Sequence, residues 1–277
     1  FLILKMFPIP RQGQHILTIF LLIFYAFLTG GQPPVVRATI MAVIFLTGFI
    51  IEREPESLNS LAAAALLLLL MNPLNLFDVG FQLSFISVLA IILFYPRFMG
   101  MFYKLLPGVR EKAGEEQKAK RDNRIATIKL KGIRFLLQSI AISLAAYLGV
   151  VPLVVYYFHL ITPIVIITNL VIVPLASLTI FLGMGLWAME FMLPLASFAF
   201  ASCLSFVLNA MVGIIFLCGK IPFAYIYLSD VRIWQVMLYY AILAMAIFCP
   251  WKKLSDSFQA IFLKIFHRGR IDKHLRV

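Results

Sequence analysis

A succession of eight apolar runs, separated by short polar or proline-containing segments, constrains this chain more than any other feature. In hydrocarbon every backbone N–H and C=O group must be paired within the protein, so long apolar runs form helices there. The predicted helices are 14–28, 35–51, 58–71, 79–95, 135–158, 163–189, 196–218 and 233–249. Several are shorter than the ~20 residues that span a bilayer core. The sequence therefore predicts an all-α polytopic membrane protein, a bundle of about 7–8 transmembrane helices.

Composition supports the same fold class. Hydrophobic residues make up 62% of the chain and charged residues only 13%, whereas a soluble domain carries about 25% charged residues. The net charge of +12 has three explanations: basic loops that orient a membrane protein, binding of anionic lipid headgroups, or a polyanionic partner such as nucleic acid. Charge alone favours the first two.

The basic segments predict a domain layout and a topology. We expect an N-terminal flank 1–13, a membrane domain 14–250 with a polar loop 96–134, and a basic tail 251–277. The loop holds eleven Lys or Arg residues, so the positive-inside rule places it in the cytoplasm with the N-terminus. Four further crossings return the tail there, unless the sixth segment is re-entrant. The chain begins with Phe1, and we expect it to be an internal piece of a longer protein.

No catalytic constellation is evident in the sequence. It lacks metal-binding His spacings and a phosphate-binding glycine loop, and its three cysteines are odd in number and show no zinc spacing. We therefore predict no enzyme activity, no metal and no cofactor. The four histidines are far apart in the sequence: His15, His159, His267 and His274.

Polar residues placed within the apolar runs cost free energy and are the better functional signal. Arg37 lies in the first turns of the second predicted helix, and Asp78 and Gln82 lie one turn apart at the start of the fourth. The starts of the second and fourth helices are predicted to lie at the same level, on the outer side of the membrane. Arg37 is either an arginine that extends to the interface or a charge at the mouth of a path. An Arg37–Asp78 ion pair is also possible, and its role would then be structural, as a link between the two helices.

Two further patterns concern helix geometry. Ala141, Ala145 and Gly149 recur every four residues, which predicts close helix packing. Asn169 precedes Pro174 in an apolar run, and proline lacks an N–H and clashes one turn back. We therefore predict one proline-broken or re-entrant segment, interrupted between Asn169 and Leu175. Broken helices line cavities in secondary transporters of small solutes, which is the alternative function.

Four sequence motifs occur in a fixed order. They are 30–41 (GGQPPVVRATIM), the Ala- and Leu-rich run 58–73 that ends in proline, 78–85 (DVGFQLSF), and 152–158 (PLVVYYF) followed by Asn169 and Pro174. Their order and spacing resemble the competence domain of ComEC-type DNA-uptake proteins over residues 14 to 250. Pro34 departs from that pattern, which often has Ser. The family's OB-like and nuclease domains are missing from this chain, and the basic tail leads to where the nuclease domain would begin.

The resemblance implies a channel that passes single-stranded DNA across the bacterial cytoplasmic (inner) membrane during natural transformation. It implies single-stranded DNA, membrane lipid, other DNA-uptake proteins and a second copy of the chain as partners. A structural subunit that conducts nothing is a third alternative. The candidates for the DNA path or its mouth are Arg37, Asp78, Gln82, Ser84, Asn169 and Pro174.

Overall fold

The computed structural model describes residues 10–51, 56–105, 124–192, 194–221, 224–228 and 231–248. The chain divides into two compact units, Phe1–Asp230 and Val231–Val277. In the first unit the helices are α1 (Arg11–Leu28), α2 (Pro33–Ile50), α3 (Ser57–Met71), the 3-10 helix η2 (Pro73–Phe77), α4 (Val79–Leu105), α6 (Arg124–Phe158), α7 (Val165–Met192) and α8 (Pro194–Gly219). The second unit contains α9 (Ile233–Phe248). The predicted all-α polytopic membrane fold is confirmed.

Among the described residues, five helices are long and apolar enough to cross a membrane: α2, α4, and most of each of α6, α7 and α8. The described parts of α1, α3 and α9 are apolar but shorter. A 15-residue helix such as α3 extends about 22 Å, less than the ~30 Å of a hydrocarbon core. A single two-stranded sheet occurs in the described part of the chain, in which β1 (Leu160–Ile161) pairs antiparallel with β2 (Ile226–Tyr227).

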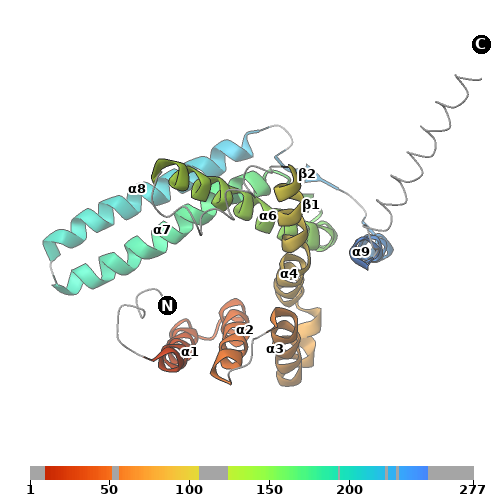
Figure 1. Ribbon diagram of the computed structural model, residues 1–277, viewed down its shortest axis with the longest axis horizontal. Coiled ribbons are helices and arrows are strands. Elements are labelled where there is room, and N and C mark those ends of the chain that lie inside the picture. The colour runs from red at the N-terminus through yellow and green to blue at the C-terminus, as the bar shows by residue number, and fades with distance from the viewer. Residues whose placement is uncertain are drawn as a thin grey trace, which may run out of the picture. The chain divides into compact units, whose positions relative to one another are not determined.

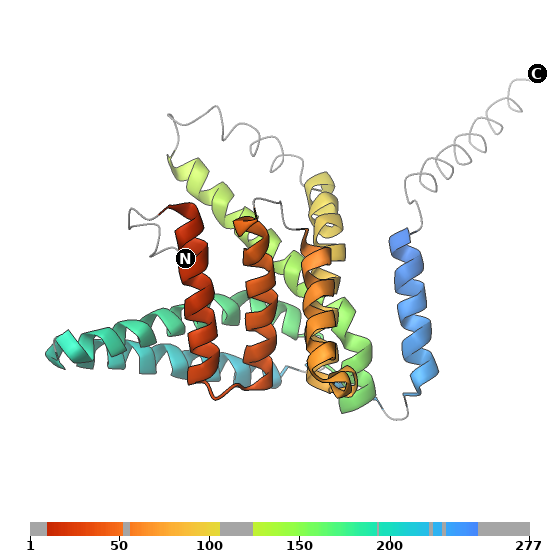
Figure 2. The same ribbon diagram turned by 90° about the horizontal axis from the view of Figure 1, so that it is seen from below.

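Helices that follow one another in the sequence pack side by side in the first unit. Figure 2 shows this arrangement for α1, α2 and α3. The turn between α1 and α2 uses Gly30 and Gly31, whose φ angles of 70° and 66° are readily adopted by glycine. Pro33 then occupies the first helical position of α2, where a missing N–H costs nothing. These local signals fix a tight reversal between two apolar helices.

The tightest helix contact in this unit joins α4 and α6, which cross as in Figure 1. A Cβ added at Gly149 would lie 2.4 Å from the Cβ of Ala90. Ala141 and Ala145 have no exposed surface. The predicted small-residue packing face is therefore confirmed, and its partner is α4. A second buried cluster, formed by α3 and the start of α4, contains Leu61, Ala64, Leu68, Phe81 and Phe85.

The helices extend into the loop predicted at 96–134. α4 continues through Pro96 to Leu105, and α6 already begins at Arg124. The guanidinium of Arg97 donates to the carbonyl of Leu93 one turn earlier, which satisfies a carbonyl near the proline. The centre of the loop, 106–123, and the basic tail, 251–277, lie outside the described residues.

The predicted break at Pro174 is wrong, because α7 is one continuous helix from Val165 to Met192 with Pro174 inside it. A proline removes one backbone hydrogen bond, and membrane helices tolerate this loss when local adjustments satisfy the freed carbonyl. The loss of one bond does not interrupt α7, and the sixth apolar run is helical from Val165 onward.

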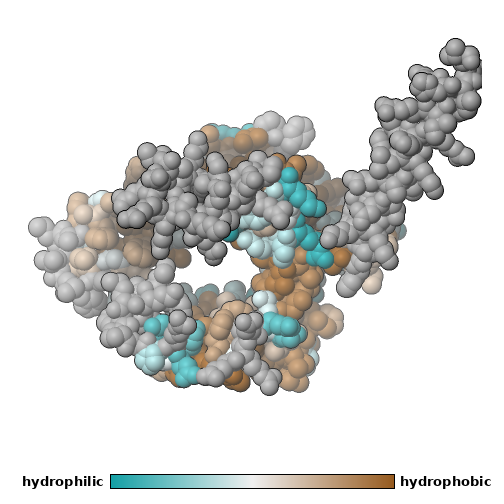
Figure 3. Space-filling model, in the orientation of Figure 1, coloured by the Kyte–Doolittle hydropathy of each residue, from teal (hydrophilic) through white to brown (hydrophobic). Residues whose placement is uncertain are grey.

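Large apolar side chains remain exposed on most helices of the first unit. Hydrophobic residues dominate the coloured surface around α3 and α4 in Figure 3. Phe181 and Trp187 on α7 and Phe206 and Phe216 on α8 are each about 70% exposed or more. Surfaces of this kind suit a lipid environment, in which apolar exposure carries no cost.

The second unit is described here by α9 alone. Its backbone begins with a local cap, because the N–H of Arg232 donates to the Oε1 of Gln235 at 2.9 Å. A side chain at the third helical position that reaches back to the cap is half of a capping box. Its apolar side chains Trp234, Met237 and Met245 are exposed, as on the helices of the first unit.

Candidate functional site

An ion pair joins α2 to the start of α4. Arg37 Nη1 donates to Asp78 Oδ2 at 2.5 Å, so the ion pair that the sequence allowed is formed. Arg37 is buried, with 8% of its surface exposed, whereas the Asp78 side chain is 48% exposed. A guanidinium removed from solvent needs a charged partner close by, because the desolvation cost is large otherwise.

Asp78 also caps α4. Its carboxylate accepts the backbone N–H of Gly80 at 3.3 Å and of Phe81 at 3.1 Å, the arrangement that favours Asp before a helix. Burial acts to raise the pKa of Asp78. The hydrogen bonds from Arg37, Gly80 and Phe81 and the charge of Arg37 outweigh that effect, so the pKa of this carboxyl lies below its ordinary value. Asp78 is therefore ionised near neutral pH.

Gly80 makes room for the guanidinium. A Cβ at this position would lie 2.7 Å from Arg37 Nη2, so any larger residue would displace the arginine. The Nε of Arg37 is buried and has no hydrogen-bond partner among the described residues. The sequence analysis did not single out Gly80, although it belongs to the motif DVGFQLSF and a glycine within a helix start is a signal for close approach.

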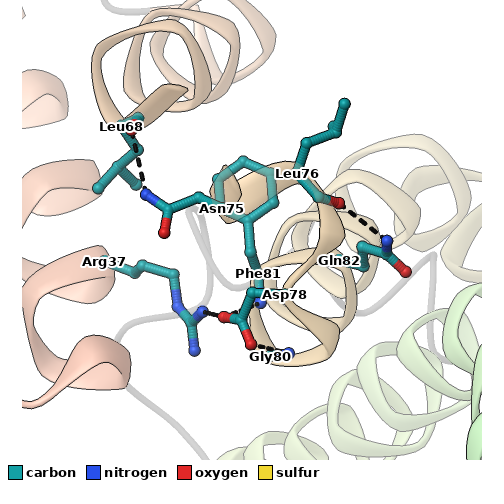
Figure 4. Close-up of polar contacts among 8 residues, drawn as sticks. All are labelled: Arg37, Leu68, Asn75, Leu76, Asp78, Gly80, Phe81 and Gln82. Carbon is teal, nitrogen blue, oxygen red and sulfur yellow. Dashed lines mark hydrogen bonds and ion pairs between the residues drawn. The ribbon is translucent and has the colours of Figure 1, made fainter. Parts of the chain in front are cut away.

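Gln82 makes a separate set of contacts that links three elements. Its Nε2 donates to the carbonyl of Leu76 in η2 at 2.8 Å, and its Oε1 accepts from the hydroxyl of Tyr157 in α6 at 2.9 Å. Because a carbonyl can only accept, the nitrogen of the amide must face Leu76, which fixes the orientation of the group. Figure 4 shows the Gln82 amide directed away from the Arg37–Asp78 pair.

The turn before α4 is held by two asparagines. Asn75 Nδ2 donates to the carbonyl of Leu68 at the end of α3 at 3.1 Å (Figure 4). Asn72 Oδ1 accepts the N–H of Leu74 at 3.1 Å, a turn motif typical of Asn. These contacts place the start of α4 relative to α3, and sequence reasoning did not find them.

Arg37, Asp78, Gln82 and Tyr157 lie at one end of α2, α4 and α6, and we call this set the polar end. α4 and α6 pack together, and the first turn of α4 meets the last turn of α6 through the Gln82–Tyr157 bond. Tyr157 was not predicted individually, although it lies in the motif PLVVYYF. The polar end contains donors, acceptors and one compensated charge, and within the described residues no three His, Cys, Asp or Glu side chains gather to hold a metal ion.

Three predicted candidates are not joined to the polar end by hydrogen bonds among the described residues. Ser84 is partly buried two residues after Gln82, and its carbonyl accepts from the hydroxyl of Ser87 at 2.8 Å. Asn169 is partly buried and Pro174 is exposed, and both lie on α7. The structure thus brings together Arg37 and Asp78, orients Gln82 separately, and leaves the α7 candidates on another helix.

An apolar cavity of about 560 Å³ lies between α1 and α2 beside the Gly30–Gly31 turn. Its walls include Ile23, Phe27 and Val36. It offers little hydrogen bonding and therefore suits hydrocarbon rather than a charged ligand.

Fold and site together define a multi-pass helical membrane protein with a hydrogen-bonded polar end. The sequence profile of the family described as "Competence protein" matches residues 1–253, and the chain belongs to this competence protein family. ComE operon protein 3 of Bacillus subtilis (strain 168) is 30% identical over 183 residues, which cover 66% of this chain and 20% of that protein. The aligned part thus spans about a fifth of this relative's length. No solved structure matches the chain significantly.

Proposed function

We propose that this chain forms the membrane-spanning part of a channel that passes single-stranded DNA across the bacterial cytoplasmic membrane during DNA uptake for natural transformation. The observation that carries the proposal is the match of the competence family to residues 1–253. In the described part of this stretch, five helices are long and apolar enough to cross a membrane. The family is named for competence, and we infer conduction of the strand from the multi-pass architecture.

The chemistry of the polar end supports this function. A strand that enters a narrow path loses hydration from its phosphates, which polar groups at the mouth must replace. An unpaired arginine would hold a phosphate strongly, whereas the charge of Arg37 is already balanced by Asp78 at 2.5 Å. We infer that Arg37 and Asp78 shape the mouth and that Gln82, with a neutral amide, faces the path. Ser84 and Asn169 are further candidates along it.

The same function implies a layout and a set of partners. We propose that residues 14–250 form the membrane domain, with the basic tail 251–277 leading to a downstream domain. The eleven basic residues of the segment 96–134 support a cytoplasmic position for it. The partners would be single-stranded DNA, membrane lipid, other DNA-uptake proteins and further copies of this chain.

The alternative, a small-solute transporter, depended on a broken helix at Asn169 and Pro174. α7 is continuous through this region, so the feature that favoured the transporter is missing from the described helix. The candidacy of Pro174 depended on the same break and loses its support with it. A subunit that conducts nothing remains to be separated from a channel by experiment.

Flux measurements on the full-length parent protein test the proposal. We would reconstitute it in sealed vesicles with an inside-positive potential, because DNA is an anion, and add labelled single-stranded DNA outside. We expect the single strand to accumulate inside and a duplex of the same sequence to remain outside. Accumulation no greater than in protein-free vesicles would refute a channel, and uptake of a labelled small solute alone would support the transporter.

A further inference from the structure

The ends of α4 and α6 at the polar end are joined by a side-chain hydrogen bond from Tyr157 to Gln82 at 2.9 Å. Their closest packing contact lies deeper, where Gly149 meets Ala90. Gln82 precedes Ala90 by eight residues, and Tyr157 follows Gly149 by eight. Eight residues correspond to about 12 Å along a helix and to an offset of about 80° around its axis, within one broad helix face. The bond therefore holds the helix ends together about two turns away from the packed crossing.

The amide of Gln82 is held on both sides. Its nitrogen donates to the Leu76 carbonyl at 2.8 Å while its oxygen accepts from Tyr157. Loss of the Tyr157 hydroxyl would leave an amide oxygen without its partner and would free the α6 end from η2 and α4. The two helices would still pack at Gly149, where Ala90 lies directly against the glycine.

We propose that Tyr157 is a positioning residue of the DNA path, which through Gln82 sets the spacing of α4 and α6 at the mouth. This inference rests on the proposed channel function. With the bond intact, the mouth presents the Gln82 amide to the strand in one orientation. Without it, the strand meets a mouth of variable width, so it binds more weakly, although the path beyond the mouth is unchanged.

The chain provides a matched control. Tyr156 is adjacent to Tyr157, and their rings meet edge to face at a centroid distance of 5.0 Å. Both tyrosines are partly buried. The hydroxyl of Tyr156 makes no hydrogen bond to any described residue, so Tyr156→Phe removes the same atom as Tyr157→Phe but leaves the bond to Gln82 intact.

The experiment measures the initial flux of single-stranded DNA into vesicles as a function of its concentration, with the full-length parent and its variants. We expect Tyr157→Phe to raise the half-saturating DNA concentration roughly fivefold, about the effect of one net hydrogen bond, with the maximum flux per inserted protein unchanged. Gln82→Leu should raise it at least as much, because it removes the same bond and also the amide that faces the strand. The double variant should be no worse than Gln82→Leu alone, because Tyr157 acts only through Gln82. Tyr156→Phe should match the wild type.

Other outcomes would overturn the inference. A merely structural bond would reduce the amount of folded protein and lower the maximum flux at an unchanged half-saturating concentration. Additive effects in the double variant would show that the two residues act separately. Equal behaviour of Tyr157→Phe and Tyr156→Phe would remove any role for the bond. If the wild-type protein passes no single-stranded DNA, the proposed function fails, and this inference fails with it.

Discussion

The α4–α6 pair and the α7–α8 pair are both antiparallel neighbours in the first unit, yet they are held together differently. A third of the membrane-spanning part of α6 is buried, against none of that part of α7. α4 and α6 meet through Gly149 and Ala90 with backbones in close approach. α7 and α8 meet where the ring of Phe200 covers Gly185 and where the Thr179 hydroxyl lies 3.5 Å from the Met211 sulfur.

This difference shows which helix pair has a geometry that is fixed by its own contacts. In lipid, apolar surface alone does not drive helices together, so close backbone packing and hydrogen bonds decide the geometry. The α4–α6 pair has close backbone packing and a hydrogen bond, and these contacts fix the orientation of the side chains at the polar end. The surface of the α7–α8 pair is left to lipid or to partner proteins, and we propose that the first pair forms the mouth of the DNA path.

The largest effect is expected at the closest contact. Gly149→Ala would place a methyl group 2.4 Å from the Ala90 Cβ, and because both atoms are bound directly to backbone, the helices must separate. We expect a loss of about 3 kcal/mol or more in unfolding free energy, measured by denaturation in detergent micelles. Gly213→Ala, which would meet nothing within 4 Å, serves as the control. Equal stability of the two variants would contradict the packing described for α4 and α6.

The second largest loss of stability is expected when Asp78, the partner of the buried Arg37 charge, is removed. Asp78→Ala leaves the guanidinium of Arg37 buried and unpaired, and it removes the cap of α4. We expect a loss of about 2 kcal/mol, less than for a fully buried pair because Asp78 is half-exposed. Addition of Arg37→Met should restore part of it in the same denaturation assay. A double variant less stable than Asp78→Ala alone would refute the assignment of Arg37 as a buried charge.

A smaller change in stability is expected when the pH is lowered. The pKa of Asp78 is lowered in the folded protein, so the stability that this group contributes is complete above its unfolded pKa of about 3.9. That contribution is lost as the pH falls through the still lower folded value. Thermal stability should therefore be higher in the wild type than in Asp78→Asn at pH 6, and the difference should shrink as the pH falls below the unfolded pKa of about 3.9. A difference that stays constant throughout an acid titration would mean that the ion pair is not its source.

The smallest effect is expected in the α7–α8 pair. A Cβ at Gly185 would also come within 2.7 Å of another atom, but that atom belongs to the ring of Phe200. A side-chain ring can rotate away, whereas backbone cannot. We expect Gly185→Ala to change the unfolding free energy by less than about 1 kcal/mol. A loss as large as that of Gly149→Ala would show that both helix pairs are equally specified.

Much of the fold could be predicted because long apolar runs have one structural solution in lipid. The Arg37–Asp78 pair could also be predicted, since both residues fall at the same end of neighbouring helices. The predicted break at Pro174 is wrong because the loss of a single N–H does not by itself interrupt a helix in an apolar environment, where every other backbone group must still be paired.

The Gln82–Tyr157 bond could not be predicted from the sequence. The two residues are 75 positions apart, and their meeting depends on how α4 and α6 are registered. That register follows from the contact of Gly149 with Ala90. The pattern of small residues on α6 predicted packing but did not name the partner helix.

We propose that the polar end lies on the DNA path and that the exposed face of α7 does not. Thiol accessibility tests this claim in the full-length parent with its other cysteines replaced, using Gln82→Cys and Phe181→Cys and a water-soluble thiol reagent. At a concentration of single-stranded DNA that saturates transport, Gln82→Cys should react several times more slowly than without DNA, and Phe181→Cys should react slowly in both conditions. Reaction of Gln82→Cys at the same rate with and without the strand would contradict the account.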